Sequence, residues 1–420
     1  MNTDSPLHVC MVSNTAWSIY NYRHGVLNAL RARGVTITVV APRDRTFALL
    51  EQMGVRCIDL VVASKGTNPF EDLKLLATLR RHYRTLRPDV VFHYTIKPNI
   101  YGSVAAALAR VKSIAVTTGL GYVFIQDSTA ARVARRLYRF AFRFPREVWF
   151  LNRDDLDAFR NEALLVHPER AQLLNGEGID VAMYAPEPDD AGEAKDVGAS
   201  GTSDIAGAWG GTNAGERAHD SRIAFKPTID FVLIGRLLWD KGVGEYVEAA
   251  KALRVRYPHA RFRLLGPVGV ANPSAISQAD IDGWQRDGHI EYLGEAHDVR
   301  PHIAQADCVV LPSYREGVPR TLLEASSMAR PIVATDVPGC REVVDDGMTG
   351  LLCKARDAGD LAAKLAALIE MGPEQRHAMG LRGREKMIAE FDECHVVDRY
   401  LRTLARLTGR ALRPSPQAKA

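Results

Sequence analysis

CVVLPSYREGVPRTLLEA, residues 308–325, is the stretch on which the fold depends. The apolar run Cys308–Leu311 predicts a short buried strand, the Gly- and Pro-containing residues after it predict a loop, and a helix is expected to follow. Such a loop directs backbone N–H groups and the positive end of a helix dipole at one point, which suits an anionic ligand. Glu316 lies in this loop, and Glu324 lies about one helical turn further on.

Two carboxylates beside a helix start suit a ligand that carries both phosphates and hydroxyls, such as a nucleotide sugar. A pair of acids is also what a glycosidase uses, at a carboxylate separation that a sequence does not give. A third interpretation is a helix N-terminus with favourable acids and no ligand. This stretch alone leaves the three interpretations open.

The same strand–loop–helix pattern precedes this stretch. Residues 229–234 (IDFVLI) predict a strand and 243–256 predict a helix, with Gly235, Arg236 and Lys241 in the loop between them. Two cations beside a helix start suit a diphosphate. Further strands are expected at 261–265, 290–293, 307–311 and 331–335, the last followed by Gly339. Rim loops of this half therefore gather Arg236, Lys241, Glu316, Arg320, Glu324 and Gly339, and their convergence favours a functional site.

The first half of the chain alternates expected strands and helices, which predicts a parallel sheet covered on both faces. Strands are expected at 7–12, 35–40, 55–60, 89–93, 113–117 and 148–151, with helices at 20–33, 71–86 and 100–110. Ligands bind such sheets at the carboxyl ends of the strands, where His93, Lys97, Thr118 and Gly119 are the candidates. For His93 and Lys97 a structural role is an equal alternative, and the glycine can simply make a turn. A GxGxxG fingerprint is absent after the first strand.

Arginines recur at spacings of three and four between Arg132 and Arg146. Val133, Leu137, Phe140 and Phe144 form a neighbouring apolar stripe. A basic amphipathic helix of this kind binds an anionic membrane surface. The alternative is a surface helix whose stripe packs on its own domain. A second basic cluster at residues 80–87 favours the membrane. Asn152–Asp155 is interpreted as a helix cap and not as a metal site.

The expected domains are a first α/β domain at 1–185, a flexible connection at 186–226, a second α/β domain at 227–385, and a C-terminal helix and tail at 386–420. The connection is rich in Gly, Ala, Asp and Ser, a composition without its own core. The chain of 420 residues is too long for one ordinary core.

Composition excludes several classes of protein. The net charge of +4, from 54 basic and 50 acidic residues, is too small to indicate nucleic acid. The six cysteines are scattered without a CxxC or a Cys/His cluster, which predicts reduced thiols and no zinc site. The N-terminal residues lack the order of a signal peptide, and no apolar run is long enough to span a membrane. The expected location is cytoplasmic, at the inner face of the plasma membrane.

Gly235-Arg236, Lys241-Gly242 and Glu316-x7-Glu324 in a two-part α/β chain resemble the family 4 glycosyltransferases, which have the GT-B fold. The resemblance covers nearly the whole chain except the connection. The segments SIYNYR (18–23), GLG (119–121), GEGID (176–180) and NPS (272–274) are similar to one branch, the bacterial transferases that extend undecaprenyl-diphosphate-linked sugars in capsule, O-antigen and glycoprotein synthesis.

The resemblance implies two Rossmann-like domains with parallel sheets facing across a cleft. It also implies a retaining enzyme that takes a hexose or N-acetylhexosamine from a UDP-sugar without a metal. Arg236 and Lys241 would stabilise the leaving diphosphate, Glu316 would contact the donor sugar and Glu324 the ribose. The remaining implied donor-binding residues are Gly235, Gly317, Val318, Arg320 and Gly339. The implied acceptor is a lipid-linked glycan.

One position departs from the family pattern, because many members carry a histidine where Thr118 stands here. Either His93 or a backbone group replaces it, or the sugar is bound differently. Two other functions fit the same fold. A nucleotide-sugar epimerase would need acid/base residues placed to abstract a sugar proton. A non-catalytic nucleotide-sugar-binding subunit would need no turnover at all.

Overall fold

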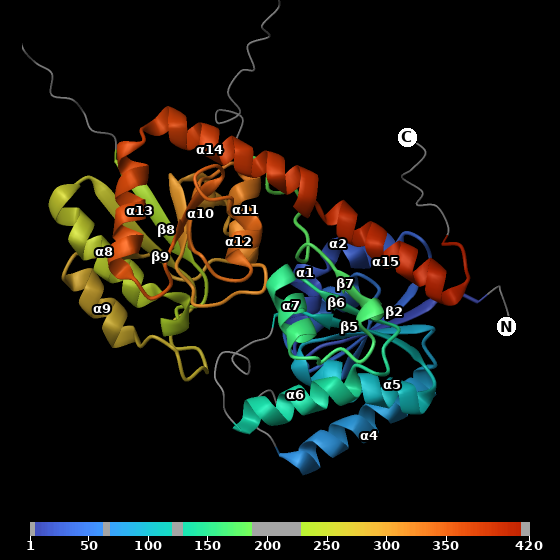
Figure 1. Cartoon of the computed structure of the whole chain (residues 1–420). Helices are drawn as coiled ribbons and strands as arrows, with labels where there is room; N and C mark the ends of the chain where they lie inside the picture. The colour runs from blue at the N-terminus through green and yellow to red at the C-terminus, as the bar shows by residue number, and fades with distance from the viewer. Residues whose placement is uncertain (1–4, 62–67, 120–128, 187–227, 413–420) are drawn as a thin grey trace, which may run out of the picture.

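The computed structural model describes residues 5–61, 68–119, 129–186 and 228–412 (Figure 1). All but the first residue of the expected connection at 186–226 lies outside these residues, as does Gly121 of the GLG segment.

The first sheet has seven strands in the order β3-β2-β1-β4-β5-β6-β7, and all neighbours are parallel. They are β1 (His8–Val12), β2 (Thr36–Ala41), β3 (Arg56–Asp59), β4 (Val90–Tyr94), β5 (Lys112–Thr117), β6 (Glu147–Phe150) and β7 (Ala171–Leu173). The last of these was not expected from the sequence.

The second sheet has six parallel strands in the order β10-β9-β8-β11-β12-β13. They are β8 (Ile229–Ile234), β9 (Ala260–Leu265), β10 (Glu291–Tyr292), β11 (Cys308–Leu311), β12 (Ile332–Thr335) and β13 (Gly350–Cys353). Each sheet contains the Rossmann strand order 3-2-1-4-5-6, so the expected pair of Rossmann-like domains is confirmed. The order reverses between β1 and β4 and between β8 and β11, and ligands bind this fold at such switch points.

Side chains of the first sheet alternate between two helical layers, as parallel strands buried on both faces require. Val9 and Met11 face the layer of α1, α2 and α3, whereas Cys10 and Val12 face α4 and α5. The helices are α1 (Ala16–Tyr22), α2 (His24–Arg31), α3 (Thr46–Gln52), α4 (Pro69–Leu86), α5 (Ser103–Ala109), α6 (Thr129–Ala141) and α7 (Arg153–Asn161). A π-helical turn at Pro98–Gly102 precedes α5.

The single helix expected at 20–33 is wrong, because α1 and α2 are separate helices with Arg23 between them. The Arg23 guanidinium is buried, pairs with Glu177 and lies 3.8 Å from the centroid of the Tyr94 ring. A buried cation needs such partners, and reaching them takes Arg23 out of helical geometry.

The second sheet is also covered on both faces. One face packs against α8 (Val243–Arg256), α9 (Gln278–Arg286) and α13 (Ala358–Glu370), and the other against α10 (Arg300–Ala304), α11 (Arg320–Ser327) and α12 (Cys340–Val343). From there α14 (Pro373–Lys386) and a π-helical turn at Met387–Phe391 lead back to the first domain (Figure 1).

The last helix, α15 (Glu393–Thr408), lies on the first sheet beside α2 (Figure 1). Its Tyr400 is buried, with its ring 4.7 Å from that of Phe92 and its hydroxyl 2.8 Å from that of Tyr94. The C-terminal helix is therefore part of the core of the first domain.

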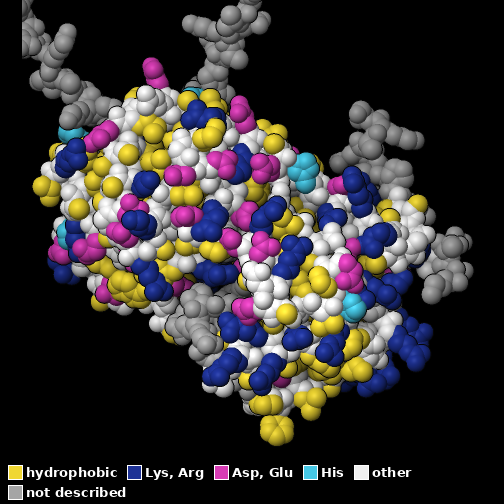
Figure 2. Space-filling view, viewed as in Figure 1, with side chains coloured by type: hydrophobic (Ala, Val, Ile, Leu, Met, Phe, Trp, Pro, Cys, Tyr) yellow, Lys and Arg dark blue, Asp and Glu magenta, His cyan; other side chains and the backbone are white. Residues whose placement is uncertain are grey.

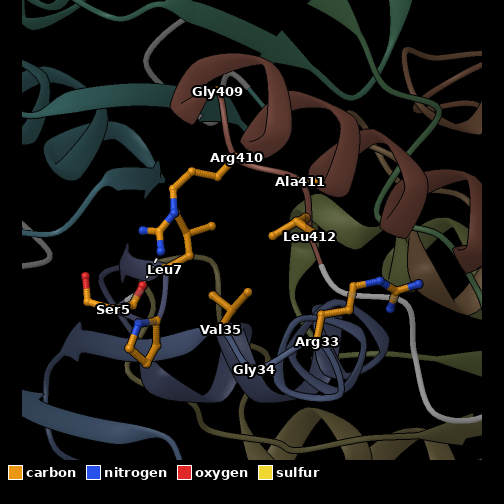
Figure 3. Close-up of a pocket in the computed structure, with 10 residues that line it drawn as sticks. Ser5, Leu7, Arg33, Gly34, Val35, Gly409, Arg410, Ala411 and Leu412 are labelled. Carbon is orange, nitrogen blue, oxygen red and sulfur yellow. Dashed lines mark hydrogen bonds between the residues drawn. The ribbon is translucent and has the colours of Figure 1, made fainter. Parts of the chain in front are cut away.

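A pocket of about 360 Å³ lies where the end of α15 meets the beginnings of β1 and β2 (Figure 3). Arg410 donates a hydrogen bond to the carbonyl oxygen of Ser5, and Leu7, Val35 and Leu412 contribute apolar lining. This is the amino-terminal edge of the sheet, opposite the edge at which the candidate residues gather.

Candidate active site

The candidate residues of the second domain lie at its switch point. Arg236 and Lys241 follow β8, and Glu316 follows β11, the neighbouring strand. Because both strands end at the same edge of the sheet, residues 75 positions apart come together. The carboxyl edges of the two sheets meet here, and we call this region the junction.

Lys241 and Glu316 form a direct ion pair between the Lys241 ammonium and Oε1 of Glu316. Both side chains are largely buried, with exposed fractions of 21% and 11%. Lys241 ends a 3-10 turn at Trp239–Lys241 and is followed by Gly242, at φ 73°. A β-carbon at Gly242 would lie 2.1 Å from the carbonyl oxygen of Pro312, so only glycine permits this approach of the two loops.

Arg236 is exposed, and within the described part of the chain it has no ion pair or hydrogen bond. Among the described residues of the junction, Arg236 is thus a free cation in the loop that carries the neutralised Lys241. An anionic group that binds here meets Arg236 without competition and meets Lys241 in competition with Glu316.

Gly317 is one of the residues through which the two domains touch. A β-carbon at this position would lie 2.6 Å from the carbonyl oxygen of Thr118, and one at Gly119 would lie 3.5 Å from the Gly317 Cα. Gly339, at φ 82°, packs on the carbonyl oxygen of Gly317 from the other side. The structure therefore brings Thr118, Gly119, Gly317 and Gly339 together through their backbones.

Glu324 and Arg320 form a second acid–base pair, 2.9 Å apart on α11. Arg320 also donates to the carbonyl oxygen of Asn21, at 2.8 Å, and so connects the pair to the first domain. Burial raises the pKa of Glu324, and the nearby Arg320 opposes that shift. Tyr184 shares this cluster, and the sequence patterns gave no indication of it.

The other two donor-binding candidates, Val318 and Gly235, lie in closely packed surroundings. Val318 packs between the cores of the two domains, and a β-carbon at Gly176 would lie 3.0 Å from its Cγ1. Gly235 directly follows β8, and its carbonyl oxygen would lie 1.9 Å from a β-carbon at Gly266. Both residues shape the loops that carry the charged groups.

His93 does not lie on the rim, and the structure corrects that expectation. As the fourth residue of β4 it points into the layer formed by α4 and α5, is 0% exposed and lies 2.8 Å from the Tyr83 hydroxyl. Burial lowers the pKa of His93 to about 3. Lys97 is partly exposed and pairs with Asp72 at 2.8 Å, so its ammonium group is already neutralised.

The first turn of α7 has a role that the sequence did not reveal. Asn152 is the expected cap, since its side chain accepts from the N–H of Asp155. Asn152–Asp155 also contacts the second domain on both sides of Glu316, as described below. No local pattern marks a contact between residues some 160 positions apart.

Within the described residues there is no group of three His, Cys, Asp or Glu side chains placed to bind a metal ion. Nor is any helix in that part of the chain both long and apolar enough to cross a bilayer.

Residues 8–152 match the family model described as glycosyl transferase 4-like, and residues 228–371 match that of glycosyl transferases group 1. The chain is 28% identical over 407 residues to the N,N'-diacetylbacillosaminyl-diphospho-undecaprenol alpha-1,3-N-acetylgalactosaminyltransferase of Campylobacter jejuni, covering 96% of this chain and 99% of that one. It is 23% identical to the UDP-Gal:alpha-D-GlcNAc-diphosphoundecaprenol alpha-1,3-galactosyltransferase of Escherichia coli over 82% of each chain.

Solved structures share the fold. Anabaena Alr3699/HepE in complex with UDP-glucose superposes with a TM-score of 0.72 at 18% identity, covering 95% of this chain and all of that one. Sucrose-phosphate synthase of Thermosynechococcus elongatus gives a TM-score of 0.72 at 15% identity over 96% and 99% of the two chains. With a GT4-like first domain and a group 1 second domain in the GT-B arrangement, the chain belongs to the family 4 glycosyltransferases.

Proposed function

We propose that this protein is a retaining glycosyltransferase that moves a hexose or N-acetylhexosamine from a UDP-sugar to a polyprenyl-diphosphate-linked glycan. The observation that carries the proposal is the Lys241–Glu316 ion pair at the switch point of the second sheet, with Arg236 in the same loop as Lys241. Two relatives that match 82% or more of the chain are named for transfer to undecaprenol-linked sugars, and one of them for a UDP-sugar donor.

The charges suit departure of a nucleoside diphosphate. Negative charge grows on the diphosphate as the glycosidic bond breaks, so fixed cations favour the transition state over the bound substrate. Arg236 is free to take this role at once, and Lys241 takes it as the sugar draws Glu316 into hydrogen bonds with its hydroxyls. Glu324 is assigned to the ribose. Cationic side chains supply the neutralisation, and we expect turnover without an added divalent metal.

The first domain supplies a surface for the membrane in which a polyprenyl acceptor lies. Figure 2 shows Lys and Arg side chains gathered on the lobe that carries α4 and α6, with hydrophobic side chains at its edge. The exposed residues of this basic face are Phe70, Leu73, Arg81, Arg84, Arg132, Val133, Arg136, Arg139, Phe140, Arg143, Phe144 and Arg146. Of the apolar stripe on α6, Leu137 is only partly exposed and packs on the domain core. We propose peripheral binding at the cytoplasmic face of the plasma membrane.

The test is release of free nucleoside diphosphate from a panel of UDP- and GDP-sugars, with and without a polyprenyl-diphosphate glycan extract and with and without EDTA. We expect release that requires the extract, survives EDTA and falls at least about tenfold, or about 1.4 kcal/mol, in Arg236→Ala, Lys241→Ala and Glu316→Gln. Lys251→Ala, at a solvent-facing ion pair on α8, is the matched control and should leave the rate unchanged.

The same assay separates the alternatives. An altered sugar nucleotide formed without extract would identify an epimerase. Tight nucleotide binding without turnover on any acceptor would identify a binding subunit. Nuclear magnetic resonance of the product gives the anomeric configuration, and inversion would refute the retaining assignment.

A further inference from the structure

The first turn of α7, Asn152–Asp155, makes a row of contacts to the second domain. Its contacts are Asn152 Nδ2 to the carbonyl oxygen of Gly317 (2.9 Å), the Arg153 N–H to Oε1 of Glu342 (2.9 Å), Asp154 to Arg341 (3.4 Å), and Asp155 to Arg315. Four consecutive residues of one domain thus contact the loop after β11 and the helix α12 of the other.

Asp155 is the charged centre of this row. It is 0% exposed, accepts a bond from Asn152 Nδ2 at 3.1 Å and pairs with Arg315, whose side chain is 22% exposed. Removing either member of a buried ion pair leaves an uncompensated charge, which is strongly unfavourable. Asp155 therefore fixes Arg315 firmly, and Arg315 is the residue before Glu316.

Asn152 fixes the residue after Glu316. Its Oδ1 accepts from the N–H of Asp155 at 2.7 Å, which caps α7, and its Nδ2 donates to the carbonyl oxygen of Gly317. The amide oxygen thus caps the helix, and the amide nitrogen donates both to Asp155 on that helix and to the second domain. Both chain neighbours of Glu316 are bound to the first turn of α7, while the carboxylate of Glu316 itself meets Lys241.

We propose that Asn152 and Asp155 are positioning residues for Glu316: contact between the domains through the first turn of α7 places the Glu316 carboxylate for transfer. The inference rests on the proposed function, because it assigns these residues to the same site. Arg236 and Lys241 belong to the second domain alone, so nucleotide affinity does not depend on these contacts, whereas turnover does.

Three single variants and one double variant test this. Asn152→Ser keeps a good capping oxygen and removes the amide nitrogen that donates to Gly317 and to Asp155. Asp155→Asn and Arg315→Gln each break the buried pair, and their double variant removes both charges. Asp157→Asn is the matched control, because Asp157 pairs with Arg160 on the same helix in an exposed position.

We expect kcat to fall at least tenfold in Asn152→Ser and Asp155→Asn while the Kd for UDP changes less than threefold. The double variant should be no worse than the poorer single variant, as expected for two residues that act as a pair. The Asp157→Asn control should match the wild type. A kcat within twofold of wild type in Asn152→Ser and Asp155→Asn, or a loss of UDP affinity equal to the loss of kcat, would overturn the inference.

A distance measurement needs no activity. Spin labels at Leu108→Cys on α5 and Val255→Cys on α8, in a chain with Cys57→Ser and Cys394→Ser, report on the two domains. We expect longer and broader distances in Asn152→Ser and Asp155→Asn than in Asp157→Asn. Unchanged distances would refute the contact's role. If the distances change as expected while no donor–acceptor pair reacts even with the wild type, the proposed function fails and the interdomain contact stands.

Discussion

At the scale of single residues, Gly317 sets how closely the two domains approach. Its Cα hydrogen faces the Thr118 carbonyl oxygen, where a methyl group would lie 2.6 Å away, closer than real β-carbons come to oxygen atoms. The neighbouring atoms are backbone and cannot turn aside. We expect Gly317→Ala to separate the loops and to reduce nucleotide release at least tenfold, measured with saturating donor.

The matched control for Gly317→Ala is Gly283→Ala on α9, where a β-carbon meets nothing within 4 Å. Alanine is favoured over glycine inside a helix by about 0.5–1 kcal/mol, so this variant should be active and no less stable than the wild type. Wild-type activity in Gly317→Ala would show that the domains do not need this close approach.

The buried His93 gives a pH dependence to stability. Its pKa is about 3 in the folded protein and 6.5 as the ordinary value, so below pH 6.5 the unfolded chain binds more protons than the folded one. The contribution of neutral His93 to the stability of the folded protein is complete above pH 6.5 and is lost as the pH falls toward 3. When the pH falls from 7 to 5, the free energy of unfolding measured by urea titration should decrease by about 2 kcal/mol more in the wild type than in His93→Gln, because glutamine does not titrate. Equal decreases in the two proteins would show that His93 is protonated in the folded protein as readily as in the unfolded chain.

Some residues of the site could be predicted from the sequence and others could not. Arg236, Lys241 and Glu316 follow strands that neighbour each other in any Rossmann-like sheet, so their proximity follows from the topology. The side of the sheet to which His93 points depends on its register in β4, and the strand boundary was expected one residue too early. The second role of Asn152 depends on where the other domain lies, which no local pattern contains.

At the scale of elements, α6 packs on the core with one face and exposes basic and apolar side chains on the other. Its Tyr138 and Ala141 are buried, whereas Arg136, Arg139 and Phe140 face solvent. Each basic side chain near an anionic surface contributes about 1 kcal/mol. We expect Arg136→Gln/Arg139→Gln/Arg143→Gln to weaken binding to phosphatidylglycerol-containing vesicles at least tenfold at low salt, measured by sedimentation.

A control of equal charge comes from the second domain, where Arg254, Arg286 and Lys354 are also exposed. Their triple glutamine variant should bind vesicles like the wild type if α6 is the contact. Equal weakening in both triple variants would show that net charge, and not the basic face, governs binding. Increasing salt should weaken vesicle binding by the wild type, because ions screen surface charges.

The elements differ in how well a sequence predicts them. The end of β8 and the start of α8 follow from uninterrupted patterns, because Gly235 directly follows the strand and Gly242 directly precedes the helix. The edge strands β7 and β13, with three and four residues, were not expected from the sequence. The break between α1 and α2 depends on a pairing of Arg23 with a glutamate 154 residues away.

At the scale of the whole molecule, the alternation of strands and helices predicts the two parallel sheets. It does not predict that the C-terminal helix α15 returns to the first domain. Tyr400 packs on Phe92 and bonds to Tyr94, more than 300 residues earlier. The first domain is therefore discontinuous in sequence, and its core is completed only by the C-terminal helix.

We expect Tyr400→Ala to destabilise the first domain selectively. Removing a buried aromatic side chain costs about 3–5 kcal/mol, and the cavity would open beside Phe92 and Trp149. In hydrogen exchange followed by mass spectrometry, peptides from β1, β4 and β5 should lose protection while those from β8 and β9 keep it. Tyr246→Ala, at a buried tyrosine of α8 that bonds to the Phe231 carbonyl, is the mirror-image control and should have the reverse effect. If Tyr400→Ala instead reduces the protection of β8 and β9, α15 stabilises the second domain. The C-terminal helix would then belong to the domain that it follows in the sequence.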